Sequence, residues 1–198
     1  MIIFLRHGQT VFNIEHKYQG TSDSPLTEQG ILQAMAMARL LTAYQPVHYY
    51  LSPAPRVWAT FKYMKDTVPA PHTILRELCE ICYGEWEGKT KMEAEKSPLW
   101  GQRENDRFHF VHPGSHNGKP GESYAQQYKR LIPLLERFIT EGQKDNIFII
   151  AHQGVLVCVK KYFAHLSDEE AGKVRVQNDT ALVVEINGNE YRLVEKQL

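Results

Sequence analysis

The stretch Met1-Ile2-Ile3-Phe4-Leu5-Arg6-His7-Gly8-Gln9-Thr10 begins with five apolar residues and then turns abruptly polar. A short apolar run rich in β-branched and aromatic residues, ended by polar groups and a glycine, is typical of a strand buried in a parallel sheet. Ligands of such sheets bind at the carboxyl ends of the strands. There an arginine can hold phosphoryl oxygens and a neutral imidazole can attack phosphorus, whereas the simpler interpretation is a charged loop after an ordinary strand.

Further apolar runs and helical periodicities alternate along the rest of the chain. They predict strands at 47–51, 72–75, 146–151, 181–186 and 191–194, and helices at 27–42, 54–66, 122–141, 155–165 and from about 167. This alternation predicts an α/β fold: a three-layer sandwich with a mostly parallel central sheet and helices on both faces. Asn187-Gly188 predicts a type I′ hairpin between the last two strands, which adds an antiparallel edge.

The length of 198 residues favours a single domain, 1–198. Within it, residues 77–88 have no clean period and are expected to form a loop. The segment at about 89–121 is polar, aromatic and charged, with Pro113-Gly114 and 118–121 as breakers. We therefore expect a lid-like insertion over the sheet, because long insertions of this kind often serve as lids or binding loops.

Composition narrows the classes of function and compartment. Lysines and arginines number 23, as do aspartates and glutamates, so no polyanion-binding surface for nucleic acid is expected. Arg6 cuts the first apolar run short of a signal peptide, and no later run is long enough to span a membrane, so we expect a cytoplasmic protein. The three cysteines, Cys79, Cys82 and Cys158, fit a reducing compartment and are expected to be buried or half-buried thiols.

Three of the predicted strands end in residues that can contact a phosphate. Arg6 and His7 follow the first strand, Ser52 and Arg56 follow the second, and His152 follows the strand at 146–151. The carboxyl ends of parallel strands lie along one edge of a sheet. We therefore expect two histidines and two arginines to converge on one small anion.

These residues belong to an ordered set of motifs that resembles the histidine phosphatase superfamily, the group that includes the cofactor-dependent phosphoglycerate mutases. The set spans nearly the whole chain. It comprises Arg6-His7-Gly8-Gln9-Thr10, Asn13, Gln19-Gly20-x-x-Asp23-x-Pro25-Leu26-Thr27, Ser52-x-x-x-Arg56-x-x-x-Thr60, Glu80-x-x-x-Gly84-x-Trp86-Glu87-Gly88, Gly121-Glu122-Ser123 and Ala151-His152-x-Gly154.

The resemblance implies a role for each matching residue. His7 would be the nucleophile that becomes a phosphohistidine, and it must be neutral to attack. Arg6 and Arg56 would clamp the phosphoryl oxygens, and His152, expected as a cation, would donate to the same oxygens. The expected substrate-binding residues are Asn13, Gln19, Gly20, Gln153 and Gly154, the last two through amide hydrogens at a helix start.

The proton donor to the leaving group must be a carboxylic acid near these strand ends. Glu77, Glu80 and Glu85 lie close enough in sequence to compete for the role. Physical arguments from the sequence alone do not select the proton donor among these three residues. The spacing from Glu80 to 84–88 matches the phosphatase branch of the family, so the resemblance implies Glu80.

The resemblance leaves phosphatase and mutase open, because both begin with transfer of a phosphoryl group to the histidine. Related mutases carry an adjacent arginine pair in the insertion and a mobile carboxy-terminal tail. Here Arg103 and Arg107 are not adjacent, and few residues follow the last predicted strand. We therefore expect a phosphomonoesterase that acts on a small phosphorylated metabolite with water as acceptor. A third interpretation is an idle phosphate-binding domain, that is, one that binds phosphate without catalytic activity.

No cofactor or metal is required for this chemistry. His109, His112 and His116 in the insertion lack a recognised metal-ligand spacing, so they either face solvent or contact a polar part of the substrate. The sequence selects no particular phosphomonoester. It also leaves open whether the final hairpin pairs with a second copy to form a homodimer.

Overall fold

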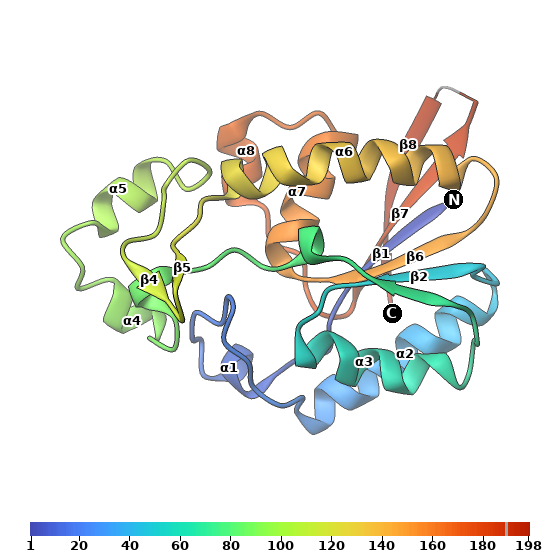
Figure 1. Cartoon of the computed structure of the whole chain (residues 1–198), viewed down its shortest axis with the longest axis horizontal. Coiled ribbons are helices and arrows are strands. Elements are labelled where there is room, and N and C mark those ends of the chain that lie inside the picture. The colour runs from blue at the N-terminus through green and yellow to red at the C-terminus, as the bar shows by residue number, and fades with distance from the viewer. Residues whose placement is uncertain (189) are drawn as a thin grey trace.

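The computed structural model describes residues 1–188 and 190–198. Among them, six strands form a central sheet in the order β3-β2-β6-β1-β7-β8 (Figure 1). The four strands from β3 to β1 are parallel, and β7 and β8 add an antiparallel edge beside β1. The bounds are β1 (Ile2–Arg6), β2 (His48–Leu51), β3 (His72–Ile74), β6 (Ile147–Ala151), β7 (Thr180–Asn187) and β8 (Glu190–Gln197).

Strand β1 lies inside the sheet and contacts helices on both faces. Ile3 and Leu5 pack in the same cluster as α2 (Glu28–Thr42) and α3 (Pro55–Lys65). Ile2 and Phe4 point the other way, toward α6 (Tyr124–Gly142) and α7 (Gln153–Phe163). All four side chains are fully buried, and burial of side chains of this size stabilises a fold by about 1.5–3 kcal/mol each.

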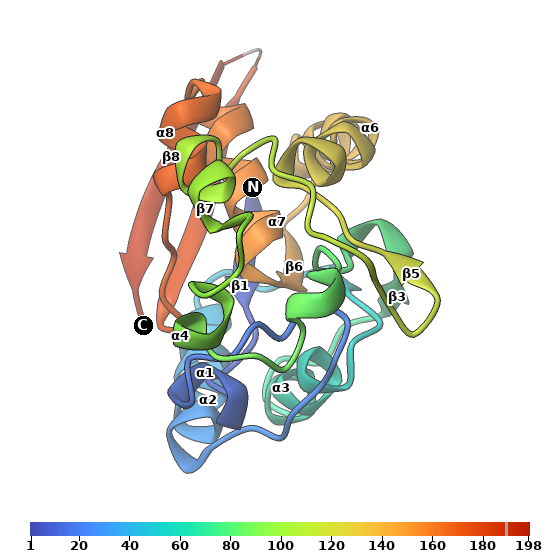
Figure 2. The same cartoon turned by 90° about the vertical axis from the view of Figure 1, so that its left-hand side faces the viewer.

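Helices cover both faces of the sheet, which confirms the three-layer α/β fold. Figure 2 shows α2 and α3 on one side, and α6, α7 and α8 (Asp168–Lys173) on the other. The larger helices begin at polar caps: Thr27 accepts from the amide of Gly30, and Ser123 accepts from the amide of Gln126. Helix α7 starts at Gln153, two residues earlier than its apolar pattern predicts. His152 is still extended, and the helix begins directly after it.

The antiparallel edge is a hairpin, as expected. Val183 faces Val194, and the pairing continues outward to Asn187 and Glu190. The predicted type I′ turn includes residue 189, which lies outside the described residues, so the turn type stays a prediction.

In the described part of the chain, no helix is long and apolar enough to cross a membrane.

The segment 89–121 has more structure than its sequence indicates. It contains α4 (Lys91–Ala94), α5 (Trp100–Asn105), β4 (Ser115–His116) and β5 (Lys119–Pro120), and β4 pairs with β5. All four elements lie beyond the carboxyl ends of β1 and β6 (Figure 1). The expected loop before it carries two single-turn elements, η1 (Arg76–Leu78) and η2 (Gly84–Trp86). A further short helix, α1 (Val11–Ile14), is not among the helices that the sequence predicts. Helices this short leave no hydrophobic period in a sequence.

Candidate active site

The parallel register brings the polar strand ends together. Arg6 pairs with Ala151, and the amide of His7 donates to the Ala151 carbonyl at 3.1 Å. His7 and His152, one residue beyond the ends of β1 and β6, therefore lie side by side, with ring centroids 5.4 Å apart. Ser52 follows β2 along the same edge, where its amide donates to Ile150. The expected convergence of the strand ends is present.

His7 is buried and held in the neutral form. Its Nδ1 lies 2.8 Å from the carbonyl of Gly8 and donates to it, so Nε2 carries the lone pair. Arg56 Nε donates to that Nε2 at 3.2 Å. Burial, together with the charges of Arg56 and Arg6, lowers the pKa of His7 well below its usual value. Asn178 fixes the backbone by donating to the His7 carbonyl at 2.6 Å.

Arg56 connects the two histidines to the loop that precedes α2. Its guanidinium is 2% exposed, and each of its three nitrogens donates to an acceptor. The Nη groups bind the carbonyls of Gly20 and Ser22, both at 2.8 Å, and Asp23 at 3.0 Å. The Asp23 contact was not singled out in the sequence, although Asp23 stands in the quoted motif.

His152 differs from expectation. We expected a cation, but Arg56 Nη2 donates to its Nδ1 at 3.1 Å, which requires a lone pair there. Its Nε2 lies 2.7 Å from Ser52 Oγ and donates to it. Burial and then the charge of Arg56 lower the pKa of His152 well below its usual value. His152 is therefore neutral, and Ser52 contacts this histidine.

Arg6 has donors left over for a ligand. One of its Nη groups donates to the carbonyl of Val176 at 2.9 Å and lies 3.5 Å from Gln153 Oε1. Its Nε is buried and has no hydrogen-bond partner among the described residues. A buried guanidinium N–H without an acceptor costs free energy that an anion in the cleft would recover.

Of the three competing carboxylates, only Glu80 reaches the strand ends. Glu77 and Glu85 are exposed, whereas Glu80 is buried. Glu80 accepts from the amides of Gly154 at 3.1 Å and Ile81 at 3.0 Å. Burial thus agrees with the choice that the family spacing implied.

The cleft itself has a volume of about 120 Å³, and its walls include seven of the catalytic or binding candidates that bear polar side chains. Lys17, Tyr18 and Tyr83 also line it, and of these Lys17 and Tyr18 were not singled out for the site in the sequence. Their positions depend on loop geometry, which no spacing records. The full lining is Arg6, His7, Asn13, Lys17, Tyr18, Gln19, Gly20, Arg56, Glu80, Tyr83 and Gln153.

The expected substrate-binding residues divide into two groups. Asn13, Gln19 and Gln153 line the cleft while also bonding to neighbouring loops. Gly154 differs from expectation, because its amide donates to Glu80. A Cβ atom at Gly154 would lie 2.2 Å from a Glu80 oxygen, so glycine is needed for this close approach.

Gly20 takes a left-handed conformation that only glycine adopts easily, with φ of +54°. Beneath this loop, the buried Glu87 carboxylate accepts from the amides and hydroxyls of Thr21 and Ser22, at 2.6 to 2.9 Å. Burial acts to raise the pKa of Glu87, but these hydrogen bonds outweigh it and the pKa lies below its usual value. Glu87 thus fixes the loop whose carbonyls hold Arg56.

The three histidines of the insertion lie in different surroundings. His112 is buried among aromatic rings and donates from Nδ1 to the Glu122 carbonyl at 2.8 Å. His116 contacts Ser22 and Glu87. His109 is exposed and bridges Asp106 and Asp168. In the part of the chain that the structure describes, no group of three or more His, Cys, Asp or Glu side chains is arranged to hold a metal ion.

The cysteines are free thiols, as expected. Cys82 and Cys158 are buried and Cys79 is half-buried. Burial raises the pKa of Cys158 above its usual value, so this thiol stays protonated.

Comparison with known proteins assigns the family. Residues 2–197 match the model of the histidine phosphatase superfamily (branch 1). The chain belongs to this superfamily. The resemblance seen in the sequence motifs is therefore confirmed for the histidine phosphatase superfamily as a whole.

The superfamily relatives of this chain include phosphatases and mutases. An adenosylcobalamin/alpha-ribazole phosphatase of Escherichia coli (strain K12) is 28% identical over 188 residues, covering 92% of this chain and 88% of that protein. A 2,3-bisphosphoglycerate-dependent phosphoglycerate mutase of Latilactobacillus sakei subsp. sakei is 26% identical over 237 residues, covering 100% and 98%. The crystal structure of the alpha-ribazole phosphatase from Shigella flexneri matches with a TM-score of 0.81 at 24% identity, covering 98% of this chain and 94% of that one, and so shares its fold.

Proposed function

We propose that this protein is a phosphomonoesterase that hydrolyses a small phosphorylated metabolite in two steps through a phosphohistidine on His7. The observation that carries the proposal is the state of His7. It is a neutral imidazole whose Nδ1 is fixed on the Gly8 carbonyl, with the Nε2 lone pair beside Arg56 in a cleft that Arg6 also lines. This is the arrangement that a nitrogen nucleophile needs to attack phosphorus.

In the first step, His7 Nε2 attacks phosphorus, the N–P bond forms and the ester P–O bond breaks. Glu80, protonated at the start of the cycle, gives its proton to the leaving alkoxide. Arg6 Nε and the Arg56 guanidinium donate to the phosphoryl oxygens and stabilise their negative charge. Positioning and electrostatics of this kind supply most of the catalysis in phosphoryl transfer. Arg56 Nε exchanges its His7 acceptor for a phosphoryl oxygen.

In the second step, water attacks the phosphohistidine. The Glu80 carboxylate takes a proton from that water, the N–P bond breaks, and inorganic phosphate leaves. His7 Nε2 regains its lone pair and Glu80 regains its proton. The cycle balances without a further reactant, and no cofactor takes part in either step.

One observation favours mutase-type transfer as the second candidate. Arg103 and Arg107 lie four positions apart, yet they line one common cavity near the cleft, where they can hold an anionic product. In that case the phosphohistidine would return its phosphoryl group to a bound monophosphate. Relatives of both kinds support the superfamily and leave this choice to experiment.

The test is a product assay on the purified protein with p-nitrophenyl phosphate and a panel of small monoesters. We expect release of inorganic phosphate, and its loss in a folded His7→Ala variant. Rapid interconversion of 3- and 2-phosphoglycerate dependent on 2,3-bisphosphoglycerate, without net phosphate release, would establish the mutase instead. Absence of both activities would leave the idle phosphate-binding domain.

A further inference from the structure

Gln127 is a fully buried side chain of α6 that lies beside the proposed proton donor. Its amide nitrogen Nε2 lies 2.9 Å from the carbonyl of Cys79 and 3.4 Å from Oε1 of Glu80. Burying an amide group costs free energy unless its donors and its acceptor are paired. A glutamine at this place therefore needs partners at both ends of its amide.

These partners fix the orientation of the Gln127 amide. The Cys79 carbonyl can only accept, so the amide atom that faces it is the nitrogen. On the opposite side, the thiol of Cys158 donates to Gln127 Oε1 at 3.9 Å. Burial raises the pKa of Cys158, which keeps this thiol protonated as a donor. One Nε2 hydrogen thus binds Cys79, and the other is available to Glu80.

A glycine makes room for this arrangement. A Cβ atom at Gly154 would lie 2.2 Å from Glu80 Oε1 and 2.4 Å from Gln127 Oε1. Any other residue at this position would therefore displace both side chains. Glu80 lies between η1 and η2, Gln127 on α6 and Gly154 on α7, so three separate parts of the chain meet at the carboxyl group.

The two oxygens of Glu80 have different numbers of donors. Oε1 accepts from the Ile81 amide at 3.0 Å and also faces Gln127, whereas Oε2 accepts only from the Gly154 amide, at 3.1 Å. A protonated carboxyl group carries its hydrogen on one oxygen and accepts best at the other. The two donors on Oε1 therefore favour Oε2 as the oxygen that carries the acidic proton.

The backbone around Glu80 is held by other residues of the same region. Arg130 Nη2 donates to the Cys79 carbonyl at 2.6 Å. Glu122 accepts from the Cys82 amide at 3.1 Å and pairs with Arg130 at 2.6 Å. Removing the glutamine amide would thus change the surroundings of the carboxyl group without releasing the segment that carries it.

We propose that Gln127 is a positioning residue for the proton donor, which holds Glu80 Oε1 and so directs the proton on Oε2 into the cleft that Glu80 lines. The same donor stabilises the carboxylate that remains after the proton has left. The 3.4 Å contact is long for a hydrogen bond, and contacts of this kind commonly tighten when substrate is bound. This inference rests on the proposed phosphomonoesterase and on Glu80 as its acid.

The test variant is Gln127→Met, which keeps the length of the side chain and removes both amide hydrogens. The Cys79 carbonyl keeps its bond from Arg130. The Cys158 thiol keeps the Tyr124 carbonyl as an acceptor at 3.9 Å. We therefore expect a folded protein, and melting followed by circular dichroism checks this. Gln127→Leu, which also lacks the amide, is the second variant and should behave in the same way.

The measurement is kcat/KM for two substrates, because this constant reports the steps through departure of the leaving group. An alkyl phosphate needs a proton on its leaving oxygen, whereas p-nitrophenyl phosphate does not. For the alkyl phosphate that the wild type hydrolyses fastest, we expect a loss of about three- to tenfold in Gln127→Met, the cost of one hydrogen bond. For p-nitrophenyl phosphate, we expect a loss of less than about twofold.

A double-mutant cycle separates positioning from a merely structural role. If Gln127 acts through the carboxylic acid, adding Gln127→Met to Glu80→Gln should change kcat/KM for the alkyl phosphate by less than about twofold. A structural role would produce the same further loss in both backgrounds.

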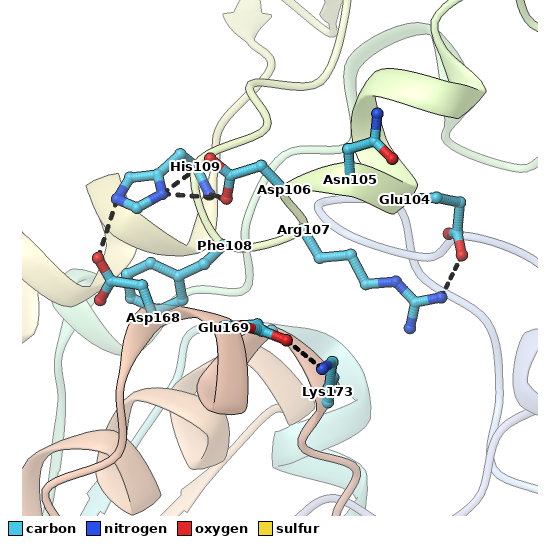
Figure 3. Close-up of a pocket in the computed structure, with 10 residues that line it drawn as sticks. Glu104, Asn105, Asp106, Arg107, Phe108, His109, Asp168, Glu169 and Lys173 are labelled. Carbon is cyan, nitrogen blue, oxygen red and sulfur yellow. Dashed lines mark hydrogen bonds and ion pairs between the residues drawn. The ribbon is translucent and has the colours of Figure 1, made fainter.

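Two control variants leave the carboxyl group untouched. Gln143→Met removes an exposed glutamine directly after α6. Figure 3 shows His109 between Asp106 and Asp168, where it connects the insertion to α8. His109→Gln weakens this contact. Both variants should keep the wild-type ratio of kcat/KM between the two substrates.

The outcomes distinguish this inference from the proposed function. Equal losses with both substrates in Gln127→Met, no loss with either, or the same further loss in the Glu80→Gln background would overturn the role of Gln127 and leave the phosphomonoesterase in place. Failure of the wild type to hydrolyse any monoester would overturn the phosphomonoesterase and this inference with it.

Discussion

Glu80 and Glu85 stand five positions apart, yet only Glu80 is buried at the strand ends. The difference arises from the amide of Gly154, which approaches closely because glycine lacks a side chain and which donates to the Glu80 carboxylate. The same contact explains why Gly154 does not offer its amide to the ligand. At the scale of single residues, the chemistry therefore depends on pairs that are distant in sequence.

A substitution at Glu80 tests its role as proton donor. Glu80→Gln keeps the shape but removes the proton, so kcat for an alkyl phosphate should fall by about 10²–10⁴-fold. The loss should be much smaller for p-nitrophenyl phosphate, whose leaving group needs no proton. Steady-state kinetics with both substrates measures this difference, and Glu85→Gln is the matched control. Equal losses with both leaving groups would mean that Glu80 is not the acid.

At the scale of elements, the insertion is held by an aromatic cluster around His112. The rings of Tyr83, Trp86 and Phe110 lie against it, and its Nε2 is buried without a partner among the described residues. Burial lowers the pKa of His112 to about 4. The insertion is therefore built around a neutral histidine.

This burial makes stability depend on pH. The unfolded chain protonates His112 below about pH 6.5, while the folded protein does not until about pH 4, so stability falls as pH drops through this window. Between pH 7 and pH 5 the contribution lost is about 2 kcal/mol. Urea unfolding should therefore show a larger acid-induced loss for wild type than for His112→Gln.

The exposed His165 offers a matched control, since His165→Asn should retain the wild-type loss. An equal loss in wild type and His112→Gln would contradict the buried, neutral state of His112. His7 and His152 also have lowered pKa values and contribute to the acid-induced loss of stability. Because all three proteins contain both residues, these contributions cancel when the variants are compared with wild type.

At the scale of the whole molecule, the sheet could be predicted because each strand carries its own signal. Strand β1 is apolar throughout because both of its faces are covered, and the polar residues after β1 and β6 align through the parallel register. His7, Arg56 and His152 were predicted to meet for this reason. The family resemblance added Glu80, which physical arguments from the sequence alone did not select over Glu77 and Glu85.

Other features escaped the sequence because they depend on several loops at once. The neutral state of His152 requires Arg56 and Ser52 on its two nitrogens, and the cavity that Arg103 and Arg107 line draws on four separate segments of the chain. The short helices α4 and α5 are too brief for a visible period. These features therefore depend on hydrogen bonds and charges between residues that are distant in the sequence, and local sequence patterns do not report them.

The central claim is that His7 carries the phosphoryl group, and rapid quenching at alkaline pH followed by peptide mass spectrometry tests it most directly. During turnover of p-nitrophenyl phosphate, we expect a phosphorylated peptide containing His7 in the wild type and none in a folded His7→Ala variant. Sustained phosphate release without any adduct on His7, or full turnover by His7→Ala, would contradict the account.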